Sequence, residues 1–142
     1  MPTATFQKFE CLSEHIAEQV HHFDTDVLKA MLSNQAPDLA AMTVKADVTE
    51  IAAGNGYIAG GVDIEASTSR TAGVTSLVGT DKVITASGGS IGPFRYVYIY
   101  NDTPTSPADP LVGVLDYGSA ISIADLEDFT LDFGASFLDI GS

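Results

Sequence analysis

The residue types that bind metal ions lie closest together at one point of the chain. His21 and His22 are followed within four residues by Asp24 and Asp26. Imidazole and carboxylate groups together bind zinc or iron. However, neighbouring residues on a helix point about 100° apart, so two adjacent histidines rarely share one ion. We therefore expect no metal here, and interpret the histidines as a helix C-terminus, where cationic side chains interact favourably with the helix dipole.

Other reactive residue types lack the partners that catalysis needs. Cys11 is the only cysteine, and no G-x-S-x-G motif is present. The acidic groups at 24–26 and 125–128, with Asp132, do not match a calcium-binding EF-hand loop. Paired carboxylates could hydrolyse glycosides, but a chain with 19 acidic residues forms such pairs by chance. We expect a protein without enzymatic activity, cofactor or metal.

The segment GNGYIA, residues 54–59, matches the letters of a dinucleotide-binding motif. That motif needs a strand before it and a helix after it, so that phosphate lies at the helix N-terminus. Gly60 and Gly61 follow immediately and would open a helix poorly. We interpret the segment as a tight turn that leads into a strand.

Three tyrosines alternate along one predicted strand, in the stretch FRYVYIYN at 94–101. Alternation places Tyr96, Tyr98 and Tyr100 on one face, with Val97 and Ile99 on the other. Tyrosine combines a rigid apolar ring with a polar tip, and it is common in interfaces and carbohydrate platforms. Three placements stay open: burial between two sheets, contact with a neighbouring subunit, or a glycan platform.

Composition limits the classes of partner. Six basic and 19 acidic residues give a net charge of −13, which disfavours nucleic acid as a partner. No apolar run reaches 18 residues, so we expect no membrane-spanning helix. The first residues, MPTATFQKFECLSEH, do not resemble a signal peptide, and a lone cysteine suits a reducing compartment.

The elements that would position these residues are mainly strands. We expect one domain over 1–142, with a helix at about 6–23, because Phe6, Phe9, Leu12, Ile16 and Val20 form a stripe at helical spacing. The stripe packs on its own domain or on a neighbouring subunit. Residues 26–33 are interpreted as a strand rather than a helix, and 54–142 as a β-rich region. The further predicted strands are 61–67, 73–78, 81–87, 94–101, 110–116, 119–123, 128–133 and 136–140. The predicted fold class is mainly β, a β-sandwich or jelly-roll-like domain with an N-terminal α-helix.

Two stretches, TEIAAGNGYIAGG at 49–61 and GGSIGPFRYVYIYNDTPTSPADPLVGVLDYG at 88–118, carry a family resemblance. They resemble small virion structural proteins of tailed bacteriophages, and the resemblance extends over nearly the whole chain. Its motifs are structural, so it implies no catalytic residues. The implied role is a head decoration, or cement, protein that stabilises the shell. A tail or fibre component with a carbohydrate-binding β-sandwich is the alternative.

The resemblance also implies location and partners. A decoration protein is made in the host cytoplasm and is bound on the capsid exterior, to the major capsid protein and to itself, commonly as a trimer. We expect the contact surface to combine the tyrosine strand, the proline loop (Pro104–Pro110) and the N-terminal segment. The predicted contact residues are Tyr96, Tyr98, Tyr100, Pro104, Pro107, Pro110, Phe6 and Phe9.

Overall fold

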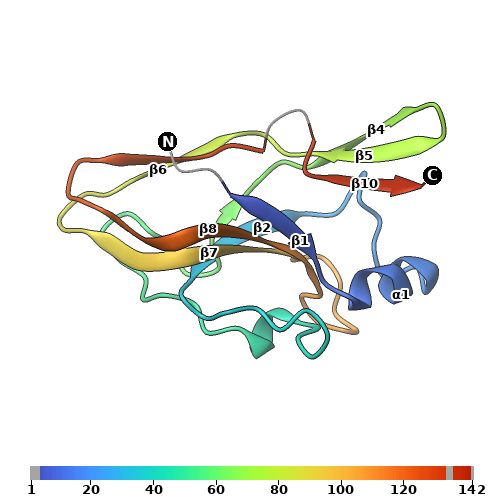
Figure 1. Ribbon diagram of the computed structural model, residues 1–142, viewed down its shortest axis with the longest axis horizontal. Helices are drawn as coiled ribbons and strands as arrows, with labels where there is room; N and C mark the ends of the chain where they lie inside the picture. Colours follow the sequence, from blue (N-terminus) through green and yellow to red (C-terminus); the bar gives the residue numbers. More distant parts are fainter. Residues whose placement is uncertain (1–3, 134–135, 142) are drawn as a thin grey trace.

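The computed structural model describes residues 4–133 and 136–141 (Figure 1). These residues form ten strands, a short α-helix and a single 3-10 turn, so the fold is mainly β, as predicted. The helices are α1 (Cys11–Ala17) and η1 (Lys45–Asp47). The strands are β1 (Thr5–Lys8), β2 (Leu28–Ser33), β3 (Val62–Asp63), β4 (Ser67–Thr71), β5 (Val74–Val78), β6 (Lys82–Thr85), β7 (Ile91–Asn101), β8 (Leu111–Ile123), β9 (Asp128–Leu131) and β10 (Leu138–Gly141).

A five-stranded antiparallel sheet in the order β1-β8-β7-β2-β3 is the centre of the fold. The two longest strands, β7 and β8, lie next to each other and run along the length of the molecule (Figure 1). Two smaller sheets, β10-β5-β4 and β6-β9, complete the architecture. Side chains from these sheets and from one face of the five-stranded sheet share a single large core, so the layers pack in a sandwich-like arrangement.

Both faces of the five-stranded sheet are buried. Val97 and Ile99 face the large core, and the intervening tyrosines face a second, smaller core. The second core is covered by residues of the connection from β2 to β3, including Leu39, Met42 and Val48. A strand buried on both faces has a continuous apolar sequence rather than a simple alternation, as β7 does.

The predicted helix at 6–23 is wrong in its extent. Residues 5–8 form β1, in which Phe6 lies opposite Leu115 of β8, and only Cys11–Ala17 are helical. Apolar spacing of three and four residues fitted one long helix, but pairing with a distant strand overrides that local preference. The helix ends before Gln19, which has φ of 61°. Leu12 remains buried in the large core, so the helix packs on its own chain.

Most predicted strands are present, with three differences. The segments 110–116 and 119–123 are one strand, β8, which continues through Gly118 with φ of 83°. The predicted strand at 61–67 is reduced to β3, and β4 was not predicted because its sequence, STSRT, is polar and wholly exposed. The strand predicted within 26–33 is confirmed as β2.

Candidate functional site

The three tyrosines of β7 lie inside the folded chain. The exposed fraction is 7% for Tyr96, 0% for Tyr98 and 1% for Tyr100. The ring of Phe9 stacks on that of Tyr98, with centroids 6.0 Å apart. Of the three placements that the sequence left open, the structure shows burial, although under a loop rather than under a second sheet.

The hydroxyl groups of two tyrosines fix the loop that covers them. Tyr98 donates to the main-chain oxygen of Gln35 at 2.6 Å, and Tyr100 donates to that of Gly60 at 2.5 Å. A buried hydroxyl without a partner destabilises a fold. The two tyrosines therefore depend on the loop for their hydrogen-bond acceptors, and these bonds hold the loop on the sheet. Burial also raises the pKa of both phenols, which keeps them neutral hydrogen-bond donors.

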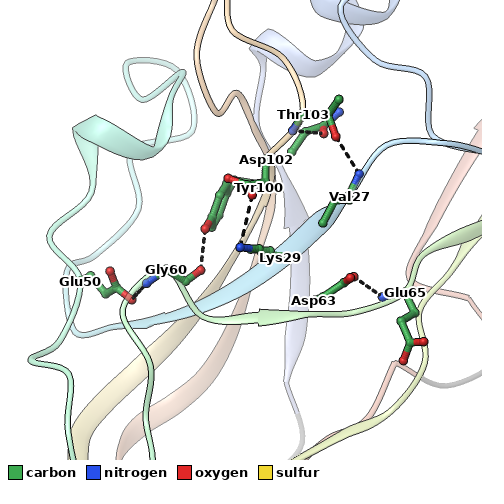
Figure 2. A network of polar contacts seen from close by, with 10 residues as sticks. Val27, Lys29, Glu50, Gly60, Asp63, Glu65, Tyr100, Asp102 and Thr103 are labelled. Carbon is green, nitrogen blue, oxygen red and sulfur yellow. Dashed lines mark hydrogen bonds and ion pairs between the residues drawn. The ribbon is translucent and has the colours of Figure 1, made fainter.

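A fourth tyrosine, which the sequence analysis did not single out, completes this arrangement. The Tyr57 hydroxyl donates to Glu50 Oε2 and accepts from the main-chain N–H of Leu32 at 3.0 Å. The same Glu50 oxygen accepts from the N–H of Gly60 at 2.7 Å (Figure 2). Burial and the bond to Glu50 raise the pKa of Tyr57. The predicted turn at 54–59 is present, closed by main-chain bonds between Gly54 and Tyr57.

Charged groups lie at the border of the aromatic cluster. Lys29 Nζ lies 3.2 Å from a carboxylate oxygen of Asp102, and the ammonium of Lys45 lies 5.6 Å from the ring centre of Tyr100. Figure 2 shows Lys29 and Asp102 beside Tyr100, with Thr103 accepting from the N–H of Val27. Partly exposed pairs of this kind contribute little free energy, about 0–1 kcal/mol. They close the edge of the cluster.

The other predicted contact residues differ in exposure. Pro104 and Pro107 are half-buried in the loop between β7 and β8, and Pro110 is buried. Phe6 is half-buried against Phe137, whereas Phe9 is buried. Phe9, Tyr98, Tyr100 and Pro110 are thus buried within the chain itself. Phe6, Pro104 and Pro107 are the more exposed of the predicted contact residues.

The histidine cluster is buried and polar. His21 Nδ1 lies 2.9 Å from the side-chain nitrogen of Asn101, which also donates to Asp26 at 2.6 Å. The ring of His21 stacks on Phe23 and meets that of His15 edge-on. Burial, reinforced by His15, lowers the pKa of His21 to about 4, so the predicted cationic role at a helix end is wrong for this residue. Within 4–133 and 136–141, no three His, Cys, Asp or Glu side chains lie together as metal ligands.

Comparisons of the chain with protein-family models, with curated proteins and with solved structures gave no match. Across the part of the chain that the structure describes, no helix has the length and apolar character needed to cross a membrane. The assignment of function therefore depends on the residues and their geometry.

Proposed function

We propose that this chain is a decoration protein of a tailed-bacteriophage capsid. It binds the outer surface of the major capsid shell, associates with copies of itself, commonly as a trimer, and catalyses no reaction. The sequence resemblance over nearly the whole chain supports this role. The fold is compatible with it, because a decoration protein needs a firm domain that bridges neighbours through broad contacts rather than a pocket for chemistry.

One observation carries the proposal: the tyrosine hydroxyl groups are bonded within the domain. Tyr57, Tyr98 and Tyr100 all bond inward, to the sheet or to the loop that covers it. Such a domain can transmit load between shell subunits without losing its shape. A specific interface buries about 1,200–2,000 Å², and several moderate contacts around a symmetric assembly add by avidity.

The same observation weighs against a carbohydrate-binding tail or fibre component. A glycan platform needs exposed aromatic rings, and the tyrosines of β7 are 7% exposed or less. We therefore place the tail or fibre role second. Binding of the purified protein to a glycan array would reverse this order.

Co-sedimentation with capsid shells tests the proposal. Expanded shells that lack the protein are mixed with the purified chain, and the pelleted fraction is measured against concentration. We expect saturable binding at a fixed number of copies per shell and a higher melting temperature of the shell. An unrelated β-rich protein with a similar negative charge is the control. Absence of saturable binding would refute the proposed function.

A further inference from the structure

A groove of about 540 Å³ opens between α1, the end of β1 and β10, and no function is yet attached to it. Figure 1 shows α1 and β10 at the same end of the molecule. The volume lies within the range of binding clefts, about 300–1,000 Å³. Leu12 and Ile16 of α1 supply an apolar wall, and Lys8, Glu10 and Asp139 supply charge. The groove thus combines apolar surface with ionic groups.

The wall formed by β10 is a strand edge rather than a strand face. Leu138, Asp139 and Ile140 all line the groove, although successive side chains of a strand point to opposite faces. A cavity that touches three residues in a row therefore runs along the edge. In the described residues β10 pairs only with β5, so its other edge has no strand beside it.

The facing wall has the same character. Within the described part of the chain, β1 pairs only with β8. The N–H of Phe9 donates to Val112 of β8 at 3.2 Å, so the main-chain groups of Lys8, one residue earlier, point away from β8. The open edge of β10 and the end of β1 at Lys8 thus border one groove. Open edges readily pair with another chain, and natural proteins cover them or use them.

We propose that this groove receives an extended segment of a major capsid subunit, which adds as a strand to the open edge of β10. Peptide binding by strand addition uses main-chain hydrogen bonds for affinity and alternate side chains for specificity. Four residues of β10 offer about 13 Å of edge, at about 3.3 Å per residue. The inference rests on the proposed function and adds to it the place and the manner of attachment.

The charge of the groove favours a shell segment over a second copy of this chain as its occupant. Glu10 and Asp139 lie on the two walls and outnumber the one basic residue of the lining, Lys8, and the whole chain carries a net charge of −13. A second copy would bring the same negative charge to an already acidic groove. A segment that carries Lys or Arg beside its apolar residues would complement it. We therefore assign the groove to a basic extended segment of the shell.

A pair of tryptophan variants tests the site. Ser13 is an exposed residue of α1 in the groove wall, and Ser69 is an exposed residue of β4, at the far edge of the β10-β5-β4 sheet. We expect Ser13→Trp to fill the groove and weaken binding to expanded shells by about tenfold or more, and Ser69→Trp to bind like the unmodified protein. Glu10→Lys, compared with Glu18→Lys outside the groove, is the second pair. Of these two variants, we expect only Glu10→Lys to weaken binding to shells and to reduce the dependence of that binding on salt.

Hydrogen exchange distinguishes strand addition from a surface contact. We expect those amides of 138–141 that point away from β5 to exchange at least about tenfold more slowly when the protein is bound to shells, with the amides of Ser67–Thr71 unchanged. If the unmodified protein binds shells and folded Ser13→Trp and Glu10→Lys bind equally well, the groove assignment is wrong and the proposed function stands. Unchanged exchange at the outward-pointing amides of 138–141 would also show that the groove assignment is wrong. If Ser13→Trp instead converts an oligomer to a monomer in light scattering, the occupant is a second copy and the shell assignment fails. If the unmodified protein does not bind shells, both proposals fail.

Discussion

The hydroxyl of Tyr57 donates a hydrogen bond to the carboxylate of Glu50, and the two residues together fasten the connection between β2 and β3 to the central sheet. Tyr57 reaches Leu32 in β2, and Glu50 reaches Gly60. The pair therefore ties one strand and two parts of the loop in a single, partly buried network. Such networks contribute more than their separate bonds suggest, because each member leaves the others unpaired when it is removed.

A double-mutant cycle measures this coupling. We expect Tyr57→Phe and Glu50→Ala each to lower the free energy of unfolding by about 1–3 kcal/mol, since each leaves a hydrogen-bond partner unsatisfied. The double variant should lose less than the sum, with a coupling free energy of about 0.5–3 kcal/mol. Urea denaturation of the four proteins supplies the values. Additive losses would mean that the two side chains act independently.

Gly61 meets the sheet too closely to accept a side chain. Its φ is +87°, and a Cβ placed there would lie 1.9 Å from the main-chain oxygen of Ala30. We expect Gly61→Ala to destabilise the protein by roughly 3 kcal/mol or more, through the clash and the left-handed backbone together.

Gly73 is the matched control for this variant. Its φ is +82°, but nothing lies within 4 Å of a Cβ placed there. Gly73→Ala should therefore lose only the backbone cost of about 1–2 kcal/mol. Thermal denaturation of both variants provides the comparison, and equal losses would show that β2 does not approach Gly61 this closely.

Because His21 is buried, we expect the free energy of unfolding to decrease in mild acid. Its pKa is about 4 when folded, against 6.5 for an unperturbed histidine, so the unfolded chain binds the proton first as the pH falls. The stability is complete above pH 6.5 and is lost progressively down to pH 4. At 1.36 kcal/mol per pKa unit, this residue accounts for roughly 3 kcal/mol.

Two glutamine variants isolate this contribution. We expect His21→Gln to flatten the curve of unfolding free energy against pH between 4 and 6.5. His22 is exposed, so His22→Gln should leave the slope unchanged. Urea titrations at half-unit pH intervals give both curves. A slope that persists in His21→Gln would assign the acid sensitivity to other groups.

Local sequence patterns predicted the strands that can be recognised without knowing which other strand they pair with. β2 and β7 follow from β-forming apolar runs that end at turn residues, whatever strand pairs with them. β1 could not be predicted, because Phe6 becomes part of a strand only through its pairing with Leu115. The same spacing of apolar residues fits a helix equally well before that partner is known.

The inward-facing site was predictable only in part. Alternation placed Tyr96, Tyr98 and Tyr100 on one face, but whether that face is covered depends on the path of the connection from β2 to β3. Tyr57 carried one signal that could have been used: an aromatic residue within a glycine-rich turn needs a reason to be there. Its bond to the N–H of Leu32 is a tertiary contact, which no local pattern specifies.

The measurement that tests the central claim most directly is a cryo-electron microscopy map of the tailed-bacteriophage particle in which we propose that this chain resides. We predict density for this β-rich domain on the outer surface of the head, in contact with the major capsid protein, with the groove between α1 and β10 turned toward a shell subunit. Density for the domain at the tail or in a fibre, or a virion without it, would contradict the account.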